Sequence, residues 1–147
     1  MLYISALSSF AQNKMEQARE NLEQYLIAKP GHMVASLMLA RTYLKLGKPK
    51  LATEVMEPHL RDIASNLEAA LMLSELYLRQ NKAFKALELL SQLQRAYPDD
   101  KKVALLEIKI MAARGKFEEA IEAIDESEHK NSDISFILTK SLLLLEI

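Results

Sequence analysis

Three histidines are the side chains of this chain that are best suited to acid–base chemistry or metal binding. His32, His59 and His129 lie far apart in the sequence, and none belongs to a His-Glu-x-x-His zinc motif. The chain also lacks a glycine-rich phosphate loop and a Gly-x-Ser-x-Gly nucleophile motif. We therefore interpret the histidines as exposed or partly packed. We expect a protein that is not an enzyme and has no catalytic residue, no metal site and no cofactor.

Six carboxylates close together form the densest charged feature. They are Glu118, Glu119, Glu122, Asp125, Glu126 and Glu128. Glu118, Glu122 and Glu126 recur every four residues, so they share one face of a helix. A cation or a basic partner would fit such a face, but a solvated outer helix surface is the interpretation we favour.

Composition excludes several classes of protein. The chain has 147 residues, of which 50% are hydrophobic, with 3 Gly, 4 Pro and no Cys. Disorder, disulfides and cysteine-based metal or redox sites are therefore excluded. The net charge of −1, from 19 basic and 20 acidic residues, gives no indication of nucleic-acid binding. No apolar run approaches the roughly 20 residues that span a bilayer, and the first residues do not resemble a signal peptide.

A period of 34 residues runs through the whole chain and indicates stacked helix pairs. Three columns keep this register: Ala18, Ala52, Ala86 and Ala120; Asn13, Gly47, Asn81 and Gly115; and Leu22, Met56, Leu90 and Ile124. The alanines should let the two helices of a pair cross closely, opposite Tyr43 and Tyr77. The Asn/Gly column should hold left-handed turn residues, and the bulky column should fill the space between pairs.

The chain is therefore predicted to be all-α, a right-handed superhelical solenoid of antiparallel helix pairs in a single domain over 1–147. The repeats are expected at about 1–32, 33–66, 67–100 and 101–134, with a half repeat at 135–147. Helices are predicted near 2–12, 15–28, 33–46, 49–63, 67–80, 83–96, 101–113, 117–129 and 134–146. Pro58 should bend or end its helix near Glu57, because it cannot occupy a first turn.

The last residues, 141–147, read SLLLLEI and suggest a helix with leucine on most sides. A solenoid end needs a polar outer face, so this helix should need a cover. Both ends of the chain look cut from a longer array. We therefore expect the last helix to pair with a further repeat or with a second copy, as a homodimer.

This pattern resembles the tetratricopeptide repeat, W-x2-L-G-x2-Y followed by A, an aromatic residue and P. The middle repeats match best, and the residues that carry the resemblance are Leu39, Ala40, Tyr43, Gly47 and Ala52, then Leu73, Ser74, Tyr77, Ala86 and Pro98. The outer repeats depart from the pattern, with Ser5, Ala6 and Ser9 in the first and Glu107, Ile108 and Met111 in the fourth. The resemblance implies a protein–protein interaction scaffold.

The resemblance also implies a concave groove lined by the first helix of each pair. The candidate partner-binding residues are Leu37, Arg41, Leu44, Leu71, Glu75, Leu78, Leu105 and Lys109, within a wider set that adds Tyr3, Leu7, Phe10, Val34, Lys45, Glu68, Arg79, Lys102 and Ala112. Leucines stand where chaperone-binding members need a polar residue, so we exclude a chaperone clamp. A leucine ladder flanked by charges suits a protein or peptide segment with apolar anchors. Alternatively, the charges pair with one another and the leucines are buried between helices.

A finer resemblance concerns the string LMLARTYLKLGKPKLATEVMEPHL. It is similar to repeats in bacterial tetratricopeptide lipoproteins found with exopolysaccharide and PEP-CTERM sorting loci. That resemblance implies a periplasmic or outer-membrane setting, although the lipid-attachment cysteine of such proteins is absent. The alternatives are a purely structural solenoid segment and a regulatory region of a larger enzyme.

Overall fold

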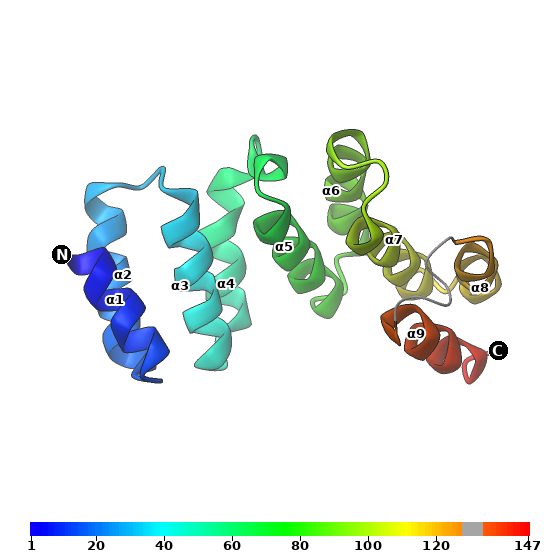
Figure 1. Ribbon diagram of the computed structural model, residues 1–147, viewed down its shortest axis with the longest axis horizontal. Helices are drawn as coiled ribbons and strands as arrows, with labels where there is room; N and C mark the ends of the chain where they lie inside the picture. The colour runs from blue at the N-terminus through cyan, green and yellow to red at the C-terminus, as the bar shows by residue number, and fades with distance from the viewer. Residues whose placement is uncertain (128–133) are drawn as a thin grey trace. The chain divides into compact units, whose positions relative to one another are not determined.

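The computed structural model describes residues 1–127 and 134–147, and every regular element in these ranges is helical (Figure 1). The α-helices are α1 (Leu2–Ala11), α2 (Met15–Ala28), α3 (Met33–Lys45), α4 (Pro49–Met56), α5 (Leu67–Arg79), α6 (Ala83–Ala96), α7 (Lys101–Ala113), α8 (Phe117–Glu126) and α9 (Ile134–Leu144). Two 3-10 helices, η1 (Glu57–His59) and η2 (Ile63–Ser65), follow α4. The predicted all-α class is confirmed. The predicted end of the eighth helix, at residue 129, lies outside the described residues.

The chain divides into two compact units, Met1–Ala69 and Ala70–Ile147. In unit 1, α1 packs on α2, α2 on α3, and α3 on α4. In unit 2, α6 packs on α7, α7 on α8, and α9 contacts both α7 and α8. The single continuous domain over 1–147 stays a prediction.

The periodic columns form the cores of both units. Ala18 and Ala52 in unit 1 and Ala86 and Ala120 in unit 2 have no exposed surface, as the close crossing of paired helices requires. The bulky column is buried as well, and so are both tyrosines that were expected to face the alanines: Leu22, Met56, Leu90 and Ile124, with Tyr43 and Tyr77. In unit 2, Phe136 and Leu143 of α9 join Ile124 in one apolar cluster.

The Asn/Gly column adopts the left-handed conformation, as predicted. The φ angles are 61° at Asn13, 72° at Gly47, 58° at Asn81 and 77° at Gly115. The next residue in each case donates its N–H to a carbonyl five positions back, as Lys48 does to Tyr43 over 2.8 Å. This six-to-one bond closes the end of the first helix of each pair and turns the chain into the second.

Pro58 ends α4 early, as predicted, so the continuous helix expected over 49–63 is wrong. The α4 helix has 8 residues, whereas α2 and α6 have 14 each. Pro58 has no N–H to donate, and its ring crowds the carbonyl one turn back. The backbone tightens into η1, and Asn66 then caps α5 by accepting the N–H of Ala69 at 3.1 Å. This junction therefore differs from the others, as expected.

Candidate partner-binding surfaces

The groove residues predicted in unit 1 are only partly accessible. Leu37 is buried, with 4% of its surface exposed, so it belongs to the core rather than to an open ladder of leucines. Arg41 forms an ion pair with Glu68, and Leu44 is half-buried. The prediction that Leu37 lines an open groove is therefore wrong. Alignment with the repeat family shows which face of a helix a residue lies on, but not how closely the next helix covers that face.

The groove residues predicted in unit 2 are closer to solvent. Leu71, Leu78 and Leu105 are half-buried. Lys109 donates from Nζ to Oε1 of Glu75 at 2.9 Å, so the first helices of two successive pairs are joined by an ion pair. Two of the three flanking charges, Glu75 and Lys109, thus pair with each other, as the alternative interpretation held, whereas Arg41 pairs with Glu68. Because the side chains of Glu75 and Lys109 remain partly exposed, their pair contributes little to stability.

A shallow hollow lies directly beside this ion pair. It has a volume of ≈ 180 Å³ and is lined by Glu75, Leu78, Arg79 and Lys109. Three of these four side chains were among the predicted partner-binding residues. The hollow therefore lies among residues of the predicted groove, whose binding of a partner stays a prediction.

A larger apolar hollow, the α9 pocket, also has Lys109 in its lining. It has a volume of ≈ 520 Å³ and is lined by Lys109, Ala112, Phe117, Thr139, Leu142, Leu143, Leu145 and Glu146. The sequence analysis did not predict this pocket, although the leucines of 141–147 were its signal. We interpreted those leucines as a surface that another chain or repeat would cover. The sequence alone could not show that they line a cavity together with residues of α7 and α8.

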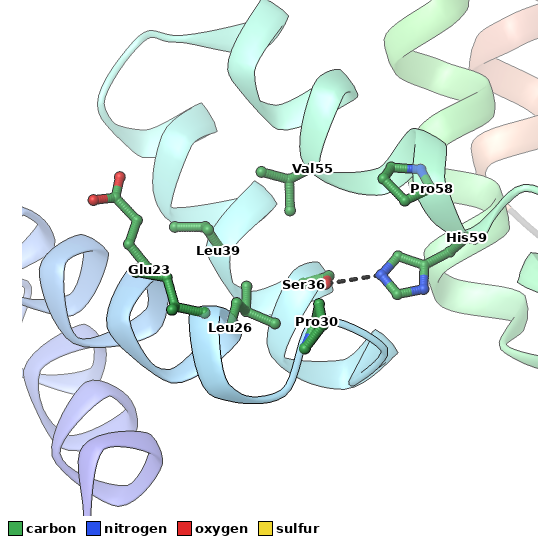
Figure 2. A pocket seen from close by; sticks show the side chains of 9 residues that line it. Glu23, Leu26, Pro30, Ser36, Leu39, Val55, Pro58 and His59 are labelled. Atoms are coloured by element: carbon green, nitrogen blue, oxygen red, sulfur yellow. Dashed lines mark hydrogen bonds between the residues drawn. The ribbon is translucent and has the colours of Figure 1, made fainter.

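Unit 1 holds a second apolar hollow, the α4 pocket, shown in Figure 2. It has a volume of ≈ 330 Å³ and is lined by Glu23, Leu26, Ile27, Pro30, Ser36, Leu39, Val55, Pro58 and His59. Leu26, Leu39 and Val55 lie between Glu23 at one end and His59 at the other (Figure 2). The pocket lies beside the early end of α4, so the same proline that shortens the helix lines the hollow.

Polar groups at the two ends of the α4 pocket are bonded within the protein. Nε2 of His59 lies 2.8 Å from Oγ of Ser36, in a buried contact (Figure 2). Glu23 accepts hydrogen bonds from Arg19 at 2.9 Å and from the Tyr43 hydroxyl at 2.6 Å. Burial, followed by the bond to Glu23, raises the pKa of Tyr43 to about 12, because both disfavour the phenolate.

The described histidines serve the fold. His32 caps α3, since its Nδ1 accepts the N–H of Ala35 at 3.0 Å, and its ring packs against Tyr3 and Tyr25. His59 is buried with Ser36, and His129 lies outside the described residues. Over 1–127 and 134–147, no group of three His, Asp or Glu side chains is arranged to hold a metal ion.

Two described carboxylates of the acidic run pair with different lysines. Glu118 and Glu119 are exposed in the first turn of α8, where Lys116 pairs with Glu119 at 3.4 Å. Asp125 pairs with Lys140 of α9, and Glu128 lies outside the described residues. No helix in the described part of the chain is both long and apolar enough to cross a membrane.

Paired helices, small residues at the crossings and left-handed turns at a fixed period together define a helix-repeat interaction scaffold. The chain belongs to the tetratricopeptide repeat family, whose models match residues 9–65 and 71–133. Repeats of this family are generally non-catalytic scaffolds for protein–protein interaction. The association with lipoproteins of sorting loci stays a prediction.

Solved structures with a similar fold include several tetratricopeptide proteins. A crystal structure of MamA superposes with a TM-score of 0.82 at 16% identity, covering 98% of this chain and 79% of that one. TTC0263, a thermophilic tetratricopeptide protein of Thermus thermophilus, gives a TM-score of 0.72 at 22% identity. The match covers 99% of this chain and 80% of that one. The structure of MamA MSR-1 superposes with a TM-score of 0.73 at 21% identity, covering 99% of this chain and 84% of that one. These likenesses concern the fold alone, and a search of curated proteins finds no match.

Proposed function

We propose that this protein is an interaction scaffold that binds a partner segment on the groove side of unit 2. The observation that carries the proposal is the α9 pocket, whose volume of ≈ 520 Å³ falls within the usual range for binding cavities. Lys109 belongs both to this pocket and to the hollow beside Glu75. An apolar anchor and a polar contact point therefore lie next to each other on one surface.

The chemistry of this surface indicates the kind of segment that fits. A large apolar side chain would enter the α9 pocket, where Phe117 and Leu142 offer apolar surface. Polar groups of the same segment would lie beside Glu75 and Lys109. The Glu75–Lys109 pair is partly exposed and easily exchanged, so it can give way to bonds with the partner. Leu71, Leu78 and Leu105 are the residues that we propose contact the remainder of the partner segment.

A random peptide library displayed on phage, selected on the immobilised protein, supplies a ligand for the test. We expect Leu142→Arg to weaken binding of a selected peptide at least about tenfold, because it places a charge in the pocket wall. Leu138→Arg is the matched control, since Leu138 lies on the same helix at 56% exposure, against 65% for Leu142, and does not line the pocket. Equal binding by wild type and Leu142→Arg would contradict the proposal.

A second variant tests the leucines of the groove. Replacing Leu71 and Leu105 with serine should abolish capture of the same peptide. Helicity by circular dichroism should remain nearly unchanged, because both side chains are only half-buried. Capture by this double variant would place the binding surface elsewhere.

We further propose a setting in the bacterial envelope, in an assembly related to exopolysaccharide. Only the similarity of one string of repeat residues supports it. Fractionation of the native host would test it, since recovery of the protein solely with the cytoplasmic fraction would contradict the assignment.

A further inference from the structure

A column of lysines accompanies the left-handed turns and has no part in the groove. Lys14, Lys48, Lys82 and Lys116 recur with the same period of 34 residues, each directly after the left-handed residue. Each is also the N-cap residue of the second helix of its pair, and none makes a side-chain capping bond. The same residue type therefore stands at the same place in all four turns.

Helix stability does not explain this choice of residue. N-cap positions favour Ser, Thr, Asp and Asn, and positive charge is unfavourable near a helix N-terminus. The same lysine lies at the C-terminal end of the preceding helix, where its charge is favourable, so the two effects oppose each other. The opposite connections do use capping chemistry, as Asp100 shows by accepting the N–H groups of Lys102 and Val103.

In unit 1, the turns α1–α2 and α3–α4 lie at the same end of their helices (Figure 1). Their basic residues are Lys14, Lys45, Lys48 and Lys50, all exposed. Lys45 Nζ lies 5.9 Å from the centroid of the Phe10 ring, which joins the two turns. The pKa of Glu16 is lowered chiefly by its bond with Arg19, and the charge of Lys48 contributes.

In unit 2, the turns α5–α6 and α7–α8 carry a similar cluster. Its basic residues are Arg79, Lys82, Lys85, Arg114 and Lys116. The guanidinium of Arg114 lies 5.6 Å from the centroid of the Phe84 ring, so residues of the two turns meet there. Phe84 is 73% exposed, which makes it a large aromatic side chain presented to solvent among positive charges.

Among the helix connections at the opposite end, the one between α2 and α3 carries Lys29, and two others carry charges of both signs. In unit 2, Asp99 and Asp100 directly precede α7, which begins with Lys101 and Lys102. In unit 1, Arg61 and Asp62 lie side by side after α4. Carboxylates also lie beside the turns, at Glu16 in α2 and at Glu118 and Glu119 in α8. Basic residues outnumber them at the turn end of each unit, although the whole chain has a net charge of only −1.

We propose that these turn ends, called here the basic turn edges, dock on an anionic lipid surface. The edge of unit 1 consists of Lys14, Lys45, Lys48 and Lys50, and that of unit 2 of Arg79, Lys82, Lys85, Arg114 and Lys116. Basic side chains beside such a surface contribute about 1 kcal/mol each. Phe84 suits the interfacial region, where aromatic and basic residues together anchor peripheral proteins. Binding of a single-stranded nucleic acid would instead need exposed aromatic side chains at successive turns, on which the bases could stack. Phe84 is the one exposed aromatic side chain of these edges, so the lipid surface fits better.

Flotation with vesicles tests the proposal. Wild-type protein should bind vesicles of phosphatidylcholine with added phosphatidylglycerol, and not vesicles of phosphatidylcholine alone. Added salt should weaken the binding, because exposed charges are screened. The triple variant Lys14→Asp, Lys48→Asp, Lys82→Asp should lose about 100-fold or more in partition coefficient, since each lysine contributes on the order of fivefold. Phe84→Ser should also weaken the binding.

A second triple variant has the same charge change away from the turn edges. Lys29→Asp, Arg61→Asp, Lys102→Asp alters three exposed basic residues and should bind vesicles better than the first triple variant does. Circular dichroism melts of both should show folded proteins. Equal losses in the two triple variants, equal binding to neutral vesicles, or binding only to a single-stranded oligonucleotide would each overturn the proposal. None of these outcomes depends on whether unit 2 binds a peptide.

Discussion

At the scale of single residues, the alanine column shows how a small side chain determines the position of a helix. Ala86 has no exposed surface and lies where the two helices of its pair cross. This role was predictable, because a small residue repeated at a fixed period must serve the same crossing in each pair. The burial of Leu37 was not predictable, because it depends on the distance between neighbouring helices.

We expect Ala86→Leu to lower the free energy of unfolding by roughly 1–3 kcal/mol, since the added atoms have no space at the crossing. Ala96→Leu is the control, because Ala96 lies at the exposed end of the same helix. Urea melts of both variants measure the difference. A midpoint for Ala86→Leu equal to that of the control would show that α6 can move away at no cost.

Tyr43 should make stability depend on pH in the alkaline range. Its pKa is about 12 in the folded protein, mainly through burial, whereas an unperturbed tyrosine has a pKa of about 10. Between these values the unfolded chain binds fewer protons than the folded one, so the free energy of unfolding falls as pH rises. This stabilisation is fully present when the pH is below the pKa of the unfolded chain. It is lost as the pH rises through the pKa of Tyr43 in the folded protein.

The variant Tyr43→Phe should lack this part of the alkaline loss, because it has no hydroxyl to titrate. Tyr25→Phe should retain it, since the bond from Tyr43 to Glu23 stays in place. Denaturant melts at several pH values compare the three proteins. Parallel curves for wild type and Tyr43→Phe would contradict the assignment.

At the scale of helices, the sequence predicted most boundaries because the turn residues are explicit. Gly47 and Pro49 mark the end of α3 and the start of α4, and Pro58 marks the early end of α4. The basic turn edges were not predicted, although the lysine column is visible in the sequence. Four lysines spaced 34 residues apart look dispersed until the fold shows that, within each unit, the two turns lie at one end of the helix pairs.

The two kinds of helix connection should respond differently to substitution. Asp100→Ala should lower the free energy of unfolding by about 0.5–2 kcal/mol, because two backbone N–H groups at the start of α7 lose their acceptor. Lys82→Ala should change it by less than about 0.5 kcal/mol, as exposed positions without a special contact do. Urea melts measure both values. A large loss in Lys82→Ala would show that the lysine is needed for folding.

At the scale of the whole molecule, α9 is the element whose surroundings are least complete. Leu143 is buried against α7 and α8, but Leu138, Leu142, Leu144 and Leu145 are at least half exposed. We propose that α9 pairs with the α9 of a second copy, since a two-fold contact is the simplest closed arrangement. The peptide and the second copy would then compete for part of the same surface.

Light scattering across a range of protein concentrations tests the pairing. We expect a shift from monomer to dimer as concentration rises, because apolar area removed from water contributes about 25 cal/mol per Å² and the exposed leucines supply that area. The variant Leu138→Arg, Leu144→Arg should remain monomeric, since it places charges on the exposed side of α9 and leaves Leu143 in its cluster. Phe84→Ser is the control, because it removes an exposed apolar side chain from another surface and should still dimerise. A wild-type protein that stays monomeric at high concentration would exclude the pairing. It would leave the exposed leucines of α9 to the peptide partner.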